Sequence, residues 1–302
     1  MSGYLEGKSV AVTGAGGGIG RAVALACASA GANVVVADYG VSLDGRDPSS
    51  DVADAVVKEI ADLGGMAVAV AGDVSTMDGG AAVVRASLDS WGRIDGVVCI
   101  AGILRERMLF NMAEEEWDPV VATHLKGHFT VFRAAAAVMR KQEGGGSLVG
   151  FTSGAFQGSV SQANYAAAKG GVVSLVRSAA AGLHRYGVTA NAVAPVARTR
   201  MSANVPMELA EMGDPEDVAP LVVYLLSDKA RHVTGQVYTA VGGKIAVWNQ
   251  PLEVRAMYTD GRWTPEEIEA RLDATVGQER MRLIDQLEAM RQAAASGDRP
   301  NS

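Results

Sequence analysis

Two side chains on one predicted helix have the residue types and the spacing for acid–base chemistry. Tyr165 and Lys169 stand four positions apart in an alanine-rich run, so on a helix they share one face that small neighbours leave open. An ammonium beside a phenol stabilises the phenolate, and we expect Lys169 to lower the pKa of Tyr165 from about 10 toward neutral. A tyrosine tuned in this way can exchange a proton with a substrate oxygen.

A glycine-rich turn follows the first predicted strand and opens the first predicted helix. It runs from Thr13 to Gly20 as TGAGGGIG, so backbone amides and the positive helix end can approach a pyrophosphate. Asp38 ends the next predicted strand about 20 residues on, where a carboxylate can accept hydrogen bonds from ribose hydroxyls and repel a 2′-phosphate. The turn contains no Arg or Lys. The pattern therefore favours NAD over NADP as the cofactor, with binding residues Gly14, Gly18, Ile19, Gly20 and Asp38.

These groups need a scaffold of alternating strands and helices. Short β-branched runs alternate with alanine-rich stretches of helical length through residues 1–243, which predicts a parallel sheet with helices on both faces. We expect one α/β domain over 1–243, a doubly wound Rossmann-type sheet of seven parallel strands. The strands are expected at 8–13, 33–38, 66–71, 96–99, 147–151, 188–194 and 236–241, and the helices near 19–30, 51–63, 79–91, 117–140, 164–186 and 215–226.

The last part of the chain, residues 244–302, is strongly charged and shows no strand alternation. Thr264 and Pro265 supply an N-cap and a first-turn proline, and apolar residues recur at helical spacing through 283–290. We expect a helical C-terminal appendage and not an independent domain. Because an amphipathic helix needs an apolar partner, we expect it to pack on a neighbouring subunit, with a lid over the substrate site as the alternative.

The composition excludes several classes of protein. Of the 302 residues 48% are hydrophobic and 20% are charged, which is typical of a globular chain and not of a disordered one. No apolar run approaches the roughly 18 residues of a transmembrane helix, and the start lacks a signal-peptide pattern. The net charge of -7 argues against nucleic acid and anionic membranes as partners. Only Cys27 and Cys99 are present, so we expect no disulfide framework, no metal site and a cytoplasmic location.

Taken together, these motifs resemble the short-chain dehydrogenase/reductase family over about residues 5–243. The resemblance implies an enzyme that passes a hydride between a nicotinamide and the carbon of a secondary alcohol. In that family the tyrosine exchanges the substrate proton, and the lysine orients the nicotinamide ribose. The matching positions also add to the implied cofactor-binding residues, which become Asp73 and Val74 after the third predicted strand, Ala101 and Gly102 after the fourth, Pro195, Tyr165 and Lys169.

Two positions depart from the family pattern. A hydroxyl residue upstream of the tyrosine polarises the substrate carbonyl in the family; ungapped spacing places Thr152 there, and one gap places Ser153 there, which we favour slightly. Where the family commonly has an asparagine in a proton relay behind the lysine, this chain has His124. We expect His124 to hold the relay water or to carry the proton itself, and a buried core histidine is the alternative.

Several segments resemble one branch of the family, the (3R)-hydroxyacyl-CoA dehydrogenase domain of the peroxisomal multifunctional β-oxidation enzyme type 2. These segments are 37–50, 101–105, 124–127, 194–201 and 218–222. The resemblance implies an NAD-dependent dehydrogenase of a (3R)-3-hydroxyacyl-CoA or a similar CoA thioester, active in lipid metabolism as a homodimer or homotetramer. Four arginines beyond strand ends could meet the CoA phosphates, namely Arg105, Arg107, Arg198 and Arg200.

Two other functions stay open at this point. One is the oxidation of a steroid or terpenoid free alcohol, for which the Met-bearing segment 201–212 would serve as a flexible apolar lid. The other belongs to a different class, an NAD-binding interaction or regulatory protein with little turnover. Comparing free alcohols with CoA thioesters separates the two enzymatic functions from each other.

Overall fold

A computed structural model describes the chain apart from residues 1–2, 43–44, 46–47, 200–211, 278 and 297–302. The chain divides into two compact units, Met1–Trp248 and Asn249–Ser302. The first unit is built on an eight-stranded sheet. In order across the sheet, its strands are β3 (Ala67–Val70), β2 (Asn33–Ala37), β1 (Ser9–Thr13), β4 (Gly96–Cys99), β5 (Gly146–Phe151), β6 (Val188–Pro195), β7 (Val237–Val241) and β8 (Lys244–Val247).

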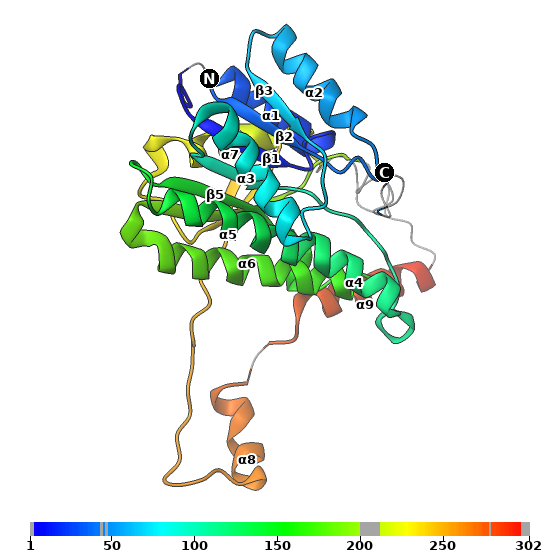
Figure 1. The fold of residues 1–302 in the computed structure, drawn as a ribbon. Helices are drawn as coiled ribbons and strands as arrows, with labels where there is room; N and C mark the ends of the chain where they lie inside the picture. The colour runs from blue at the N-terminus through cyan, green and yellow to red at the C-terminus, as the bar shows by residue number, and fades with distance from the viewer. Residues whose placement is uncertain (1–2, 43–44, 46–47, 200–211, 278, 297–302) are drawn as a thin grey trace. The chain divides into compact units, whose positions relative to one another are not determined.

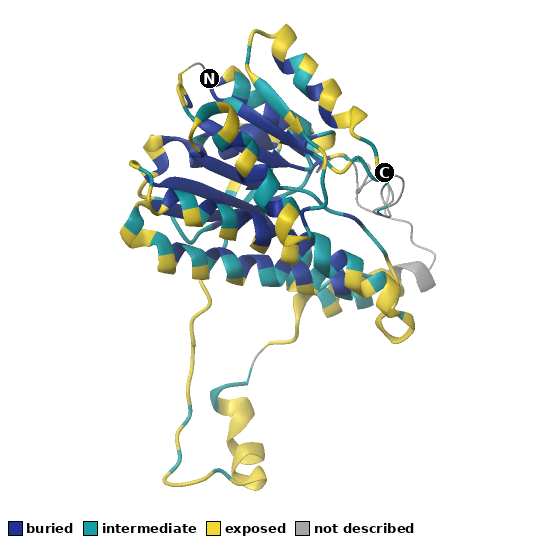
Figure 2. Ribbon diagram, in the orientation of Figure 1, coloured by how far each residue is buried: buried dark blue, intermediate teal, exposed yellow. Residues whose placement is uncertain are grey.

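Seven of these strands form the parallel sheet that the sequence predicts. Adjacent strands from β3 to β7 all pair in parallel. Within β1, Val10 and Val12 join one hydrophobic cluster and Ala11 joins the other, because successive side chains point to opposite faces of a sheet. Both faces are buried (Figure 2), which explains why these strands read as continuous apolar runs instead of alternating ones.

Helices cover both faces of the sheet, as the doubly wound arrangement requires (Figure 1). One cluster of buried residues joins α1 (Gly18–Ser29), α2 (Asp51–Asp62) and α7 (Pro215–Leu226) to the sheet. The other joins α3 (Met77–Trp91), α5 (Gly127–Met139) and α6 (Ala163–Leu183). The predicted fold class is therefore confirmed.

Two local features differ from the expectation. The eighth strand, β8, was not predicted: it returns antiparallel along β7 after a turn at Gly242 and Gly243, and its side chains are mostly exposed, so it carries no buried apolar run. The single helix expected near 117–140 is interrupted. It consists of α4 (Glu114–Val121), a π-helical turn (Ala122–Lys126) and then α5.

The second unit contains the two helices expected from the sequence. α8 (Pro265–Thr275) begins after Thr264, whose hydroxyl accepts a hydrogen bond from the Glu267 N–H, while the Glu267 carboxylate accepts one from the Thr264 N–H. This reciprocal pair is a capping box. α9 (Arg282–Ser296) follows. Among the described residues, no helix combines the length and apolarity needed to cross a bilayer.

Candidate active site and cofactor cleft

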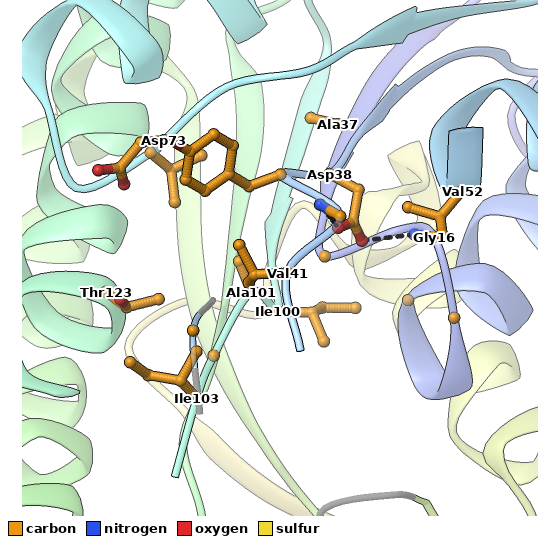
Figure 3. A pocket seen from close by; sticks show the side chains of 18 of the residues that line it. Gly16, Ala37, Asp38, Val41, Val52, Asp73, Ile100, Ala101, Ile103 and Thr123 are labelled. Carbon is orange, nitrogen blue, oxygen red and sulfur yellow. Dashed lines mark hydrogen bonds between the residues drawn. The ribbon is translucent and has the colours of Figure 1, made fainter. Parts of the chain in front are cut away.

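A cavity of about 700 Å³ opens where four parallel strands end (Figure 3). Its walls are the turn after β1, the segments that follow β2, β3 and β4, and part of the α4 region. The chain leaves β1 toward β2 and β3 on one side, and β4 lies on the other. Open α/β sheets bind their ligands at such a switch point, outside the carboxyl ends of the strands.

The glycines of the first turn keep side chains out of this cavity. A Cβ on Gly14 would lie 2.7 Å from the Ala101 nitrogen, and one on Gly20 would lie 1.9 Å from the Gly14 carbonyl oxygen. Gly14 also has a φ of +69°, which L-residues with side chains rarely adopt. The turn is thus closed to any larger residue at both positions, and it presents backbone amides at the N-terminus of α1.

Asp38 directly follows β2 and lies beside the glycine turn in the wall of the cavity. Its Oδ2 accepts a hydrogen bond from the Gly16 N–H at 2.7 Å, drawn as a dashed line in Figure 3, and its Oδ1 accepts one from the Gly40 N–H at 2.7 Å. Each oxygen keeps a further acceptor site. Among the described residues that line the cavity, Arg105 is the one basic side chain. This wall suits ribose hydroxyls and is poorly suited to an additional phosphate.

Most of the predicted cofactor-binding residues line this cavity. They are Gly14, Gly18, Ile19, Gly20, Asp38, Asp73, Val74, Ala101 and Gly102. Pro195, Tyr165 and Lys169 are not among its lining residues. Gly16 and Gly17 also line the cavity and lie within the predicted glycine turn, although they were not singled out as binding residues. The sequence did not indicate a further group of lining residues: Tyr39, Val41, Val52, Ile100, Ile103, Thr123 and Thr199. The glycine turn and Asp38 together fit a dinucleotide, and the residues that line the cavity would hold it.

Tyr165 and Lys169 lie in the first two turns of α6, as predicted. The Lys169 Nζ donates a hydrogen bond to the Phe151 carbonyl oxygen at 2.6 Å, and it lies 5.4 Å from the centre of the Tyr165 ring. The side chain is buried, and burial lowers the pKa of Lys169 from its ordinary value to about 7. Near neutral pH this lysine is therefore divided between its charged and neutral forms.

The pKa of Tyr165 moves opposite to the sequence expectation in this structure. Burial raises it, and a hydrogen bond with the Ser153 side chain partly offsets that rise. The expected lowering by Lys169 is not seen, because the ammonium is bonded to the Phe151 carbonyl and its own charge is reduced by burial. Ser153, and not Lys169, is the group that stabilises the Tyr165 phenolate here.

The geometry separates the two candidate hydroxyls. The buried Thr152 Oγ1 donates to the Lys169 carbonyl oxygen at 2.8 Å, so it braces the backbone of α6. The Ser153 Oγ accepts from the Ala155 N–H at 3.2 Å and is hydrogen-bonded to Tyr165. A substrate oxygen held by Tyr165 would meet Ser153, which favours Ser153 for polarising the substrate carbonyl.

His124 lies within the π-helical turn, edge-on to the Tyr165 ring, with 5.0 Å between the ring centres. Because a carbonyl only accepts, the bond of 2.9 Å to the Ile103 oxygen places the proton on Nε2. Nδ1 is buried and has no hydrogen-bond partner in the described part of the chain. Burial and the nearby Lys169 charge lower the pKa of His124 well below its ordinary value. Because the His124 ring is neutral and its Nδ1 can accept a hydrogen bond, the structure favours the role in which His124 holds the relay water over the one in which it carries the proton itself.

The arginines expected to form a basic rim already have partners within the protein. The Arg105 guanidinium donates to the Glu115 carbonyl oxygen, and Arg107 is paired with Glu116 at 3.5 Å. Arg198 is paired with Asp214 at 2.6 Å. Arg200 and all but the last residue of the lid expected at 201–212 lie outside the described residues. The three described arginines thus support a phosphate-binding rim less than their sequence positions suggest.

Gly102→Ala is expected to destabilise the fold by about 1–3 kcal/mol, because its Cβ would lie 2.1 Å from the His124 Cε1. The ring cannot withdraw easily from a buried site between Ile103 and Tyr165. Denaturant unfolding measures the change. Gly182→Ala on α6 is the matched control: nothing lies within 4 Å of its added methyl group, so we expect no destabilisation. Equal stability of the two variants would contradict the close packing of His124.

Comparisons with known proteins agree with this architecture. A family model described as enoyl-(acyl carrier protein) reductase matches residues 14–244. A hydroxyacyl-CoA dehydrogenase of Mycobacterium tuberculosis, ChsB1, is 44% identical over 95% of each chain. The peroxisomal multifunctional enzyme type 2 of Mus musculus is 40% identical over 87% of this chain and 36% of its own length.

A solved structure shares the same fold. The crystal structure of a short chain dehydrogenase from Mycobacterium avium has a TM-score of 0.83 and 46% sequence identity, and the match covers 92% of this chain and 97% of that one. The match to the family model contains the glycine turn from Gly14 onward, the strands from β2 to β7 and the Tyr165 helix. The chain therefore belongs to the short-chain dehydrogenase/reductase family, whose members are oxidoreductases that use a nicotinamide cofactor.

Proposed function

We propose that the protein is an NAD-dependent dehydrogenase that interconverts a (3R)-3-hydroxyacyl-CoA, or a similar CoA thioester, with its 3-oxo form. The observation that carries the reaction type is the position of Tyr165, whose ring centre lies 5.4 Å from the buried Lys169 Nζ and whose phenol interacts with the Ser153 side chain. The substrate class rests on the relatives, since ChsB1 is named a hydroxyacyl-CoA dehydrogenase and is similar over nearly the whole chain. The two lines of support are independent of each other.

Four side chains have separate roles in the proposed proton transfer. Ser153 binds the substrate oxygen, and Tyr165 in its phenolate form takes the proton of the substrate hydroxyl as that oxygen becomes a carbonyl oxygen, which leaves Tyr165 as the neutral phenol. The charged form of Lys169 places a positive charge beside the pair, and the Nδ1 of His124, which has no partner among the described residues, is available to accept a hydrogen bond from a relay water. Bound NAD supplies the acceptor for the hydride that leaves the substrate carbon.

A panel assay tests the proposal. NADH absorbance is followed with 3-hydroxyacyl-CoA thioesters of both configurations and with free steroid, terpenoid and simple secondary alcohols, each with NAD and with NADP. We expect turnover of the (3R)-thioesters with NAD. Turnover of free alcohols alone would contradict the CoA assignment and support the free-alcohol dehydrogenase. No turnover at all, with NAD still bound, would support the regulatory role.

Asp38→Ser is expected to lower kcat/KM for NAD and to raise the ratio of NADP use to NAD use, each by about tenfold or more. The change removes the acceptor for ribose hydroxyls and the negative charge that would oppose a 2′-phosphate. Initial rates with both cofactors measure the ratio. Asp51→Ser is the control, because Asp51 is an exposed acidic residue at the start of α2 and does not line the cavity. An unchanged ratio in Asp38→Ser would contradict the choice of NAD.

A homodimer or homotetramer remains part of this proposal. In the described part of the second unit, three large apolar side chains are exposed at 74–81% of their surface, namely Leu252, Val254 and Tyr258. Large apolar side chains that are exposed together favour a protein partner. We propose that a neighbouring copy of the chain supplies it.

A further inference from the structure

A second buried histidine lies one helical turn after His124 and has no role in the mechanism above. His128, near the start of α5, is 1% exposed. The Phe151 N–H donates to its Nε2 at 3.1 Å, and its Nδ1 is bonded to the His124 carbonyl oxygen. An amide N–H can only donate and a carbonyl can only accept. The two partners together therefore require a neutral ring with its proton on Nδ1.

The two backbone partners of His128 are the residues that contact the catalytic pair. Phe151, whose N–H binds the ring, uses its carbonyl oxygen to accept the Lys169 ammonium at 2.6 Å. His124, whose carbonyl binds the ring, places its own imidazole against Tyr165 and donates to the Ile103 oxygen. Four hydrogen bonds, joined through residues Phe151 and His124, thus connect Lys169 to the segment after β4, and His128 lies at the centre of this connection.

Packing leaves the His128 ring little freedom to turn. A Cβ on Gly150 would lie 3.1 and 3.2 Å from methyl groups of Val176 and Val172 and 3.3 Å from the ring Cδ2, so glycine at this position of β5 leaves room for the ring and for both valines. The Phe132 ring lies edge-on, with centres 6.0 Å apart. The carbonyl that His128 binds belongs to the π-helical turn, a rare backbone form that is frequent at functional sites.

The electrostatic surroundings keep this ring neutral. Burial lowers the pKa of His128 to about 3, and the positive charge of Lys169 on α6 acts in the same direction. The backbone of His124 in the π-helical turn and the backbone of Cys99 on β4 act in the opposite direction and offset the shift only in part. The hydrogen-bond pattern of the ring therefore does not change across the pH range in which Tyr165 and Lys169 work.

We propose that His128 is a positioning residue for the proton-transfer pair. By joining the Phe151 amide to the His124 carbonyl, it fixes the carbonyl that holds Lys169 and the ring that packs on Tyr165. It touches neither substrate nor cofactor. The inference rests on the proposed function in one respect only, that Tyr165 and Lys169 carry the proton chemistry.

Measuring which nitrogen of His128 carries the proton tests the hydrogen bonds proposed for this ring and needs no enzyme assay. In protein labelled with ¹⁵N-histidine, we expect one imidazole to show the neutral form with the proton on Nδ1 and not to titrate between about pH 5 and 9. His128→Asn identifies that signal by its loss. A His128 ring protonated on Nε2, or one that titrates in this range, would overturn the proposal.

A second measurement follows Lys169 directly. His128→Phe removes both ring hydrogen bonds and keeps a buried ring. When the Phe151 carbonyl is no longer held in place, the ammonium loses part of a hydrogen bond that favours its charged form, so its pKa is expected to fall at least about 0.5 below that of the parent protein. NMR of labelled lysine side chains measures it, with Lys169→Met for assignment. An unchanged Lys169 titration in His128→Phe overturns the positioning role, whether or not a substrate has been found.

Kinetics separate positioning from simple structural support. With the substrate found in the panel, His128→Phe is expected to lower kcat about tenfold or more and to shift the pH profile of kcat, with KM within about twofold. His128→Asn keeps a donor for the His124 carbonyl and should recover part of the loss. Met139→Leu is the control for stability alone, because Met139 is buried on the same helix but takes no part in the hydrogen bonds that connect His128 to Lys169. If His128→Phe has the same kcat and the same pH profile as this control, His128 has only a structural role. If the parent protein turns over none of the substrates, the proposed function fails. The two NMR measurements then still decide the role of His128.

Discussion

Tyr165→Phe is expected to lower kcat by about 10²–10⁴-fold while leaving the binding of NADH nearly unchanged. The substitution removes only the phenol oxygen. The ring keeps its edge-on contact with His124, and Tyr165 does not line the cofactor cavity. Single-turnover rates measure the chemical step, and titration with NADH measures binding.

Tyr238→Phe is the matched control for this change. Tyr238 lies on β7, and burial raises its pKa as it does that of Tyr165, but it is not part of the site. We expect this variant to keep full activity. If Tyr165→Phe retained more than a tenth of the parent rate, another group would have to exchange the substrate proton.

Lys169→Met is expected to abolish most turnover and, at neutral pH, to make the fold more stable. The loss of kcat should reach about 10²-fold or more, because the charge beside Tyr165 disappears. The gain in stability follows from burial of the ammonium, which lowers the pKa of Lys169 to about 7 from 10.5. A methionine fills the same buried site without a charge.

The sign of the pH dependence follows from these two pKa values. Below pH 7 both the folded and the unfolded parent carry the proton, and the full cost of burying the ammonium is present. Between about 7 and 10.5 the unfolded chain binds more protons at this position, so the free energy of unfolding of the parent rises with pH. We expect the advantage of Lys169→Met, about 2 kcal/mol or more at pH 7, to shrink across that window.

Urea unfolding at several pH values measures this difference. The exposed Lys58 on α2 provides the control, since Lys58→Met removes a charge that is already in water. Its effect on stability should not vary between pH 7 and 10.5. A constant stability difference between the parent and Lys169→Met over that range would show that Lys169 is not a buried cation.

The candidate site was predictable where its chemistry depends on local sequence. The glycine turn and Asp38 act through backbone amides, missing side chains and one carboxylate at a strand end, all of which can be read within a few residues. Tyr165 and Lys169 share a helix, so their spacing alone places them on one face. Both groups are found where the sequence places them.

The choice between Thr152 and Ser153 could not be made from spacing. The two residues follow β5 directly, where neighbouring side chains point to opposite sides of the backbone. Which of them faces Tyr165 depends on how the end of β5 packs against α6. The structure turns Thr152 to the Lys169 carbonyl and Ser153 to the tyrosine.

Proton affinities were also beyond the reach of sequence reasoning. The expected effect of Lys169 on Tyr165 assumed that the ammonium points at the phenol, but the Phe151 carbonyl holds it instead. Burial then shifts both pKa values against the charged forms. His128 carried no signal at all in the sequence, since its partner Phe151 reaches it only when β5 packs over α5.

By itself the sequence therefore determined the fold class, the dinucleotide turn, its acidic partner and the tyrosine–lysine pair, because each depends on periodicity or on groups close together along the chain. Only the tertiary structure decided which hydroxyl meets Tyr165, how Lys169 and His124 are protonated, and that His128 links them. These properties depend on contacts between β5, the π-helical turn and α6. Such contacts join residues far apart in the chain, and burial sets their electrostatics.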